Sequence, residues 1–237
     1  MNTKENQILE SARHLGHLRR TGWRRAVVVG VAAWVAMAAS PAAATAQADY
    51  TDQAVVPSPQ VYVGSPDGGP EPTLPLWRTT TDERRTLWVY FMEPPPERPH
   101  FWDQTLRAME TWNEVGGVPL RFQRTRSAQS PDVEFRWIRQ FEAHQAGTTD
   151  WETGGEGWLS SAVVTLATQH EGGTSMSDEF VLLVALHELG HVIGLPHSDD
   201  PSDVMHPGNR NMALSDRDVR SARQLYERLE SEKVTGP

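Results

Sequence analysis

The feature that most constrains this chain is the stretch HELGHVIGLPH, residues 187–197. His187 and His191 are four positions apart, so on a helix their side chains project from the same side, one turn apart. Two imidazoles in this arrangement can occupy adjacent corners of a tetrahedral zinc site. Glu188 is rotated by about 100° from His187. It is therefore poorly placed as a third ligand but can reach a water molecule on the metal.

The third ligand predicted by this stretch is His197, and Gly194 explains how it reaches the metal. A helix that continued past Gly194 would carry residue 197 to the wrong side. Glycine readily adopts the left-handed conformation that ends a helix, so the chain can reverse and bring His197 back. Three protein ligands leave one coordination position open, as in catalytic zinc sites. The alternative, partly exposed histidines near a helix end with His197 in an unrelated turn, leaves Glu188 unexplained.

The catalytic interpretation assigns a separate task to the glutamate of this stretch. A zinc ion lowers the pKa of a bound water molecule toward ~7. Glu188 would accept the proton from that water as a general base and pass it to a leaving amine as a general acid. The residues alone therefore point to metal-assisted hydrolysis.

The amino-terminal region reads as an export signal. The first 25 residues carry six Lys/Arg and two acidic residues, and residues 26–48 carry no charge. A basic start, an apolar run over 26–39 and an A-T-A or A-Q-A ending are typical of a secretory signal peptide. The apolar run is shorter than the about 20 residues of a membrane span. An uncleaved amino-terminal anchor is the alternative, and we exclude residues 1–48 from the fold.

The remaining chain divides by composition. Residues 49–82 are rich in proline and glycine and are interpreted as a linker or a short pro-segment. Residues 83–230 form the expected folded domain, and 231–237 form a tail. Beyond residue 48 the chain carries 16 Lys/Arg and 29 Asp/Glu. This acidic balance excludes nucleic acid and anionic lipid surfaces as partners. The chain has no cysteine, which excludes disulfides and thiol chemistry.

Hydrophobic patterning predicts a mixed domain. Alternation of apolar and polar residues predicts strands over 86–92, 120–124, 132–138 and 161–168. A helix is expected between the first two strands, with an apolar face made of Trp102, Leu106, Met109 and Trp112. The Gly116-Gly117 pair should end it.

Two further helices are expected. FVLLVAL, residues 180–186, is apolar all round and predicts a buried helix, which Ser175 and Asp178 would begin as a capping box. Ser215 and Asp218 predict the start of the last helix. That helix should run to about Leu229, with Val219, Ala222, Leu225 and Tyr226 facing inward.

At these residues the sequence resembles the metzincin zinc endopeptidases, whose signature HExxHxxGxxH is followed by a methionine turn. The methionine here would be Met205, which in that family lies beneath the metal as a hydrophobic floor. Within the metzincins the chain is most similar to the matrixins, the matrix-metalloproteinase-like branch. Ser198 after the third histidine, the Met-x-Pro turn and LSDRDVRSARQLY carry this likeness.

The resemblance implies an α+β fold, the zincin/metzincin catalytic domain. A twisted, mostly parallel sheet of about five strands would pack on two helices, with a C-terminal helix after the methionine turn. The strand count from patterning is one short, so an edge strand is expected between Arg139 and Ser160. The segment after Met205, with His206 and Pro207, would form a wall of the substrate pocket.

Several departures from the matrixin pattern limit the metal content. Matrixins usually hold a structural zinc and calcium in a His/Asp-rich loop, of which His144 is the one matching position. We therefore predict one catalytic Zn²⁺ and no structural zinc, and the sequence does not favour calcium. His170 and His206 are expected to be exposed and not metal-bound. The acidic residues near this loop are interpreted as solvated in preference to a cation site: Asp150, Glu152, Glu156 and Glu171.

Together these observations predict an exported zinc endopeptidase that acts on proteins or peptides as a monomer. It would be secreted or extracytoplasmic, in a periplasm or at a cell surface. One alternative is a zinc hydrolase of another amide, such as a cell-wall peptide. Another is a secreted, non-catalytic zinc-binding module, although structural zinc sites usually have four protein ligands.

Overall fold

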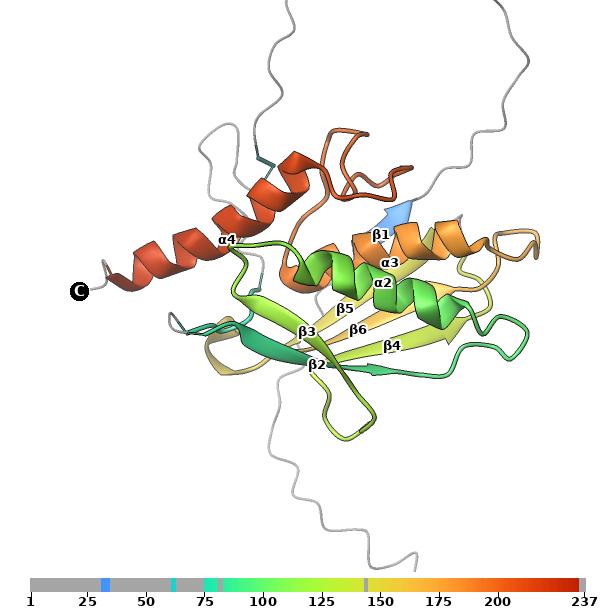
Figure 1. Cartoon of the computed structure of the whole chain (residues 1–237), viewed down its shortest axis with the longest axis horizontal. Coiled ribbons are helices and arrows are strands. Elements are labelled where there is room, and N and C mark those ends of the chain that lie inside the picture. Colours follow the sequence, from blue (N-terminus) through green and yellow to red (C-terminus); the bar gives the residue numbers. More distant parts are fainter. Residues whose placement is uncertain (1–30, 35–60, 63–74, 81–82, 143–144, 235–237) are drawn as a thin grey trace, which may run out of the picture.

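A computed structural model of the chain describes residues 31–34, 61–62, 75–80, 83–142 and 145–234 (Figure 1). The strands are β1 (Val31–Trp34), β2 (Arg85–Phe91), β3 (Leu120–Thr125), β4 (Val133–Ile138), β5 (Gln145–Thr153) and β6 (Leu159–Ala167). The helices are α2 (Phe101–Asn113), α3 (Asp178–Ile193) and α4 (Asp216–Val234), with a 3₁₀ turn at Gly155–Gly157.

The strands form one mixed sheet in the order β1-β5-β6-β4-β2-β3. β2, β3, β4 and β6 run parallel, whereas β5 pairs with β6 in the antiparallel sense. Helices α2 and α3 lie side by side over one face of the sheet, and α4 lies apart from it (Figure 1). The predicted α+β architecture is confirmed, and the expected fifth domain strand is β5.

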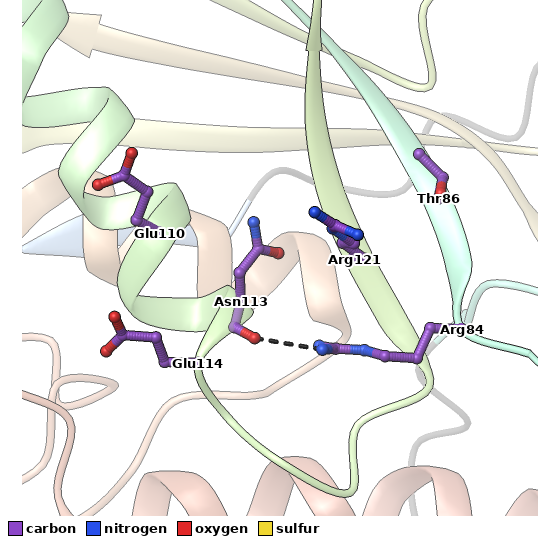
Figure 2. Close-up of a pocket in the computed structure, with 6 residues that line it drawn as sticks. All are labelled: Arg84, Thr86, Glu110, Asn113, Glu114 and Arg121. Atoms are coloured by element: carbon purple, nitrogen blue, oxygen red, sulfur yellow. Dashed lines mark hydrogen bonds between the residues drawn. The ribbon is translucent and has the colours of Figure 1, made fainter.

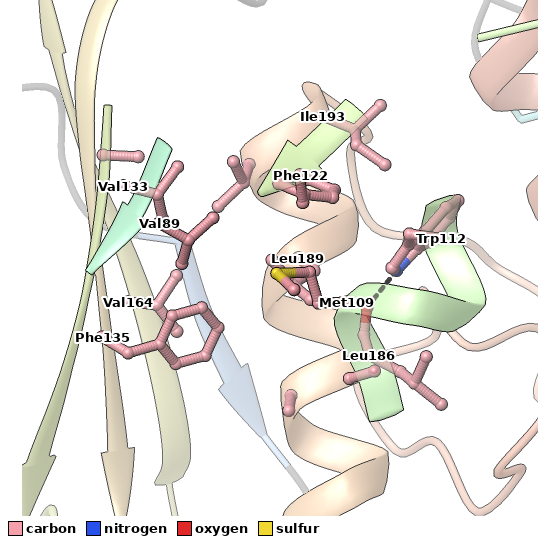
Figure 3. Close-up of a cluster of buried hydrophobic side chains, with 14 of the residues drawn as sticks. Val89, Met109, Trp112, Phe122, Val133, Phe135, Val164, Leu186, Leu189 and Ile193 are labelled. Carbon is pink, nitrogen blue, oxygen red and sulfur yellow. Dashed lines mark hydrogen bonds between the residues drawn. The ribbon is translucent and has the colours of Figure 1, made fainter. Parts of the chain in front are cut away.

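The hydrophobic core lies between the sheet and the two covering helices (Figure 3). On the sheet side it contains Val89, Val133, Phe135 and Val164, and on the helix side Met109, Trp112, Leu186, Leu189 and Ile193. Full burial of one such side chain contributes roughly 1.5–3 kcal/mol. The core thus fixes α3, the helix that carries the histidine stretch, against the sheet.

The predicted apolar face of α2 is confirmed at Met109 and Trp112, which are buried, whereas the first turn of the helix buries other residues as well. Phe101, Thr105 and Ala108 are fully buried, whereas Trp102 and Leu106 are only half-buried. Trp102 stacks on Phe91 at 6.3 Å between ring centroids and lies beneath the guanidinium of Arg124. The buried side of α2 packs against both the sheet and α3, so it is wider than the single stripe that periodicity predicted.

The two predicted helix caps had different outcomes. The Ser215–Asp218 capping box is confirmed, because Ser215 Oγ accepts the Asp218 amide at 3.0 Å and Asp218 Oδ2 accepts the Ser215 amide at 2.9 Å. The predicted cap at Ser175 is wrong, since Ser177 caps α3 through a 3.1 Å bond from the Phe180 amide. Ser175 instead pairs with Gln169 in an isolated bridge. At its other end α4 continues to Val234, beyond the predicted end at Leu229.

Some residues before position 83 pack onto the domain. Trp77 is fully buried and bridges to Leu159 of β6. Strand β1 lies within residues 1–48, which we had excluded from the fold, and pairs antiparallel with β5 from Val31↔Thr149 onward. In the full chain these four residues therefore extend the sheet, which the sequence did not predict. The domain boundaries stay predictions, and most of the predicted leader lies outside the described residues. No helix in the described ranges is long and apolar enough to cross a membrane.

Candidate metal centre and active site

Three histidines converge at the carboxyl end of α3. His187 and His191 lie one turn apart on the helix, and His197 lies on the loop that follows it. One ring nitrogen of each lies within 4.8 Å of those of the other two. The fold therefore brings the three predicted ligands together in space.

The hydrogen bonds of the His187 and His191 rings fix which nitrogen of each of these two histidines is left for a metal ion. His187 Nδ1 lies 2.7 Å from the Val204 carbonyl, and His191 Nδ1 lies 2.8 Å from the Leu195 carbonyl. A carbonyl oxygen can only accept, so both Nδ1 atoms carry the proton and both Nε2 atoms present lone pairs.

The two Nε2 lone pairs of His187 and His191 point at one another across 3.1 Å. Two acceptors cannot form a hydrogen bond, and a cation between them would relieve their repulsion. In a tetrahedral zinc site with Zn–N bonds near 2.05 Å, ligand nitrogens lie about 3.3 Å apart. His197 Nε2 is also buried and has no hydrogen-bond partner among the described residues. The donor set fits a zinc ion.

Burial keeps these imidazoles in the form that binds metal. It lowers the pKa of His187 to about 4, and the pKa values of His191 and His197 are also lowered, mainly by burial. Neutral imidazole is the ligand form. At neutral pH the cluster is therefore ready to bind a metal ion without first losing protons.

Gly194 ends α3 as expected, and two observations explain why this position favours glycine. Its φ is +107°, the left-handed region that residues with a side chain rarely adopt. A Cβ at this position would also collide with the side chain of Leu76. The reversal at Gly194 brings His197 back toward His187 and His191, as predicted.

Glu188 is fully buried beside the histidines. Its Oε2 accepts a 2.7 Å hydrogen bond from the Thr149 hydroxyl on β5, and its Oε1 has no partner within the described part of the chain. Burial raises the pKa of Glu188 to about 8, Thr149 opposes this and Asp150 adds to it. A cation at the histidines would shift the equilibrium toward the carboxylate.

Sequence reasoning missed two β5 residues that shape the surroundings of Glu188. Thr149 is fully buried, and a Cβ at Gly147 would lie 2.6 Å from Glu188 Oε1. Neither residue belongs to the 187–197 stretch, and no pattern in β5 marked them. The glutamate is therefore oriented by the strand as well as by its own helix.

Met205 is fully buried and packs against α3 at Gly190, the residue before His191. A Cβ on Gly190 would collide with the Met205 sulfur, so glycine at that position allows the close approach. The Met205 carbonyl accepts the Ser198 amide at 2.9 Å, and the preceding carbonyl, of Val204, holds His187. The turn thus supports the cluster through both its side chain and its backbone.

A matrixin family model matches residues 89–227. The chain belongs to the matrixin family. Human matrix metalloproteinase-26 is 27% identical over 186 residues, which cover 70% of this chain and 67% of that protein. Metalloendoproteinase 1 of Glycine max is 27% identical over 174 residues, 65% of this chain and 53% of that protein. Cat matrilysin is 48% identical over 50 residues, which are 19% of each chain.

The match therefore spans about half of the soybean relative and a fifth of cat matrilysin. Family membership makes this a zinc metalloendopeptidase domain, for which the family implies a catalytic zinc. Among the described residues, His187, His191 and His197 are the group of side chains that could hold such an ion.

The carboxyl end of the active helix of this matrixin is held by aromatic donors. The last carbonyls of a helix have no partner within it and need one when buried. The Trp151 indole donates to the His191 carbonyl at 3.2 Å and the Trp77 indole to the Val192 carbonyl at 2.7 Å. The Tyr226 hydroxyl donates to the Ile193 carbonyl at 2.8 Å. Sequence reasoning did not identify these roles.

Among the described histidines, His206 and His170 are not part of the cluster. His206 and Pro207 follow Met205 and are half-buried, and His206 Nδ1 accepts the Gly208 amide at 3.0 Å. His170 is half-buried against Phe180 instead of exposed, with ring centroids 4.8 Å apart. His144 lies outside the described residues, as does the side chain of Glu156. Asp150, Glu152 and Glu171 are exposed.

A separate hollow lies at the carboxyl end of α2 (Figure 2). It is lined by Arg84, Thr86, Glu110, Asn113, Glu114 and Arg121. Arg84 Nη1 donates to the Asn113 carbonyl at 3.2 Å. Charges of both signs line this hollow, and none of its six lining residues is a histidine.

Proposed function

We propose that this matrixin is an exported zinc-dependent endopeptidase in which Glu188 is the general base and acid. The metal would be held by His187, His191 and His197. One observation carries the proposal: three ring nitrogens converge, and the glutamate that follows the first of these histidines on α3 has a buried carboxyl oxygen, Oε1, that lacks a partner within the described residues. A structural zinc site would have no use for that oxygen.

The chain's own residues divide the reaction between them. When bound, zinc supplies a Lewis acid that polarises the substrate carbonyl and makes water acidic. Glu188 Oε1 is free to accept a proton from the attacking water and then to deliver it to the leaving amine. The Thr149 hydroxyl binds the other carboxyl oxygen, Oε2, and so leaves Oε1 available for this proton transfer.

The edge of β5 supports a binding mode for an extended peptide. Apart from its pairing with β1, β5 is the edge strand of the domain on the side of Glu188. A peptide added to such an edge gains main-chain hydrogen bonds. Residues 31–33 already pair in this way with Thr149, Thr148 and Gly147. We propose that the substrate backbone uses the same edge, with His206 and Pro207 as part of the pocket wall.

Export rests on the amino-terminal sequence, with its basic start, apolar run and small-residue ending. A secreted or extracytoplasmic location agrees with this leader, and a retained anchor is the other outcome. Sequencing the amino terminus of protein recovered from culture medium and from membranes would distinguish them. A mature terminus between residues 45 and 49 in the medium would support cleavage, whereas an intact terminus in membranes would support the anchor.

The central test is Glu188→Ala, with Glu179→Ala as the matched control because Glu179 is an exposed glutamate on the same helix. We expect Glu188→Ala to keep its zinc, measured by metal analysis, and to lose about 10²–10⁴-fold in peptide cleavage. Glu179→Ala should resemble the unmodified chain. Full cleavage by zinc-loaded Glu188→Ala would refute the proposed role.

Two alternatives are outcomes of the same assay. An unbiased peptide mixture and purified cell-wall material should be digested in parallel, because the same cluster could hydrolyse a cell-wall amide. Cleavage of wall material alone would favour that hydrolase. Loss of thermal stability on metal removal, with no activity in either digest, would favour a non-catalytic zinc-binding module.

A further inference from the structure

The pair Val61–Tyr62 lies within the proline- and glycine-rich segment and is held against α4. The Tyr62 amide donates to Ser221 Oγ at 3.1 Å, and the Tyr62 hydroxyl donates to Asp218 Oδ1 at 2.9 Å. The guanidinium of Arg217 lies 5.4 Å from the centre of the Tyr62 ring. Three contacts to one stretch of α4 fix both the backbone and the side chain of this residue.

Asp218, which receives the Tyr62 hydroxyl, is a fully buried carboxylate. Its Oδ2 accepts the amides of Val204 at 2.8 Å and Ser215 at 2.9 Å. Its Oδ1 accepts the Met205 amide at the longer distance of 3.3 Å, in addition to Tyr62. A buried carboxylate needs donors at both oxygens. Of the two hydrogen bonds to Oδ1, the one from the Tyr62 hydroxyl is shorter than the one from the Met205 amide.

The backbone of Val204, through its amide and its carbonyl, connects this carboxylate to the metal centre. Its amide donates to Asp218, and its carbonyl accepts the Nδ1 proton of His187 at 2.7 Å. That second bond sets the tautomer and orientation of the His187 ring. A continuous line of hydrogen bonds therefore runs from the Tyr62 hydroxyl through Asp218 and Val204 to His187.

Tyr62 also remains a donor throughout the neutral range. Burial, followed by the charge of Asp218, raises the pKa of the Tyr62 hydroxyl well above its ordinary value. Because the hydroxyl keeps its proton, it acts as the donor in its hydrogen bond to Asp218. Its direction of donation is thus the same at every pH at which the protein would work.

We propose that Val61–Tyr62 is a strap that stabilises the methionine turn, with Tyr62 acting as a positioning residue for the ligand His187. Tyr62 touches neither the metal site nor the reacting atoms and works through Asp218. The functional domain then begins before Val61 and not at residue 83. Maturation that removed the whole of 49–82 would remove the strap, so the proposal requires that Val61–Tyr62 stay attached to the domain. The inference rests on the proposed function only in taking the cluster as a zinc site.

The test compares Tyr62→Phe with Tyr90→Phe in the full chain. Tyr62→Phe removes the hydroxyl but keeps the ring over Arg217, and Tyr90 is a half-buried tyrosine on β2, a different element. Zinc affinity is read by competition with a chromophoric chelator, and the site geometry by the visible spectrum of the Co²⁺-loaded protein. Asp218→Asn is the reference variant, because Asp218 is one bond nearer to His187 and its loss should have the larger effect on zinc affinity.

Loss of an outer partner of a metal-binding histidine weakens metal affinity by about 10–100-fold. We expect that range for Asp218→Asn, and about threefold to tenfold for Tyr62→Phe, which acts one bond further out. The Co²⁺ spectrum should change in both variants and stay unmodified in Tyr90→Phe. Far-UV circular dichroism at the titration temperature checks that each variant is folded.

Wild-type zinc affinity and spectrum in Tyr62→Phe would overturn the proposal, as would an equal loss in Tyr90→Phe. If Tyr62→Ala weakened zinc binding while Tyr62→Phe did not, the ring would matter and the hydroxyl would not, which also contradicts it. Zinc titration needs no substrate. A chain that binds zinc but cleaves no peptide would therefore defeat the proposed function and leave the strap standing.

Discussion

The Thr149 hydroxyl donates a 2.7 Å hydrogen bond to Glu188 Oε2, and so joins the edge strand β5 to the active helix α3. Both residues are fully buried, and this bond lowers the pKa of a carboxyl group that burial alone would raise further. Strand and helix therefore jointly set the protonation of the proposed general base.

Thr149→Val keeps the shape of the side chain and removes the donor, so the pKa of Glu188 should rise. The acidic limb of the kcat/KM profile of the zinc-loaded protein should move to higher pH by about one to two units, since a hydrogen bond to a charged group contributes roughly 1.5–3 kcal/mol. Thr149→Ser retains a hydroxyl and should largely preserve the profile. Coincident profiles for all three proteins would rule out this role of Thr149.

Gly194→Ala should destabilise the protein and weaken zinc binding together. A left-handed backbone costs a residue with a side chain about 1–2 kcal/mol, and the added methyl group also meets Leu76. Gly155→Ala is the matched control because a Cβ there meets nothing within 4 Å. Urea unfolding and zinc titration read the two effects. Equal stability in the two variants would contradict our account of the helix end.

The metal-free protein should lose stability in acid because of its buried histidines. The pKa of His187 falls from 6.5 to about 4 on folding, and the pKa values of His191 and His197 are also lowered. Between these pH values the unfolded chain binds more protons than the folded chain. The free energy of unfolding should therefore fall as pH drops from 6.5 to 4, by up to roughly 1.4 kcal/mol per pH unit for each such histidine.

This measurement is cleanest in the Glu188→Gln background. The pKa of Glu188 is raised to about 8 in the folded state, which gives the opposite slope between pH 4.5 and 8. Chemical denaturation of the chelator-treated variant at several pH values then measures the free energy of unfolding without the opposing contribution of Glu188. Adding His187→Gln should reduce the slope by about one proton. A flat dependence from pH 6.5 to 4 would show that the histidines are not buried in neutral form.

Strand β1 should compete with substrate for the edge of β5. Residues 31–34 occupy that edge in the full chain, so a chain that begins at residue 49 should show a lower KM with little change in kcat. Full-length Ala32→Pro/Ala33→Pro should behave similarly, because proline cannot donate to the ladder. The same KM in all three proteins would indicate that β1 and substrate do not share the edge.

The sequence by itself determined the features that depend on neighbouring residues. The spacing of His187 and His191 follows from the helical period, and the helix end at Gly194 follows from the backbone freedom of glycine. Alternating patterns located β2, β3, β4 and β6, and the Ser215–Asp218 cap was read from its spacing. The cap at Ser177 was missed because two serines near the same helix start offered similar local signals.

The tertiary structure decided which distant residues complete the centre. Thr149 lies 39 positions from Glu188, Trp77 lies 115 from Val192 and Tyr62 lies 156 from Asp218. Each satisfies a buried polar group whose need arises only once the sheet, α3 and α4 have packed and excluded water. Ligand spacing is a local property of one helix, whereas the partners of buried carbonyls and carboxylates are set by the packing of the whole domain.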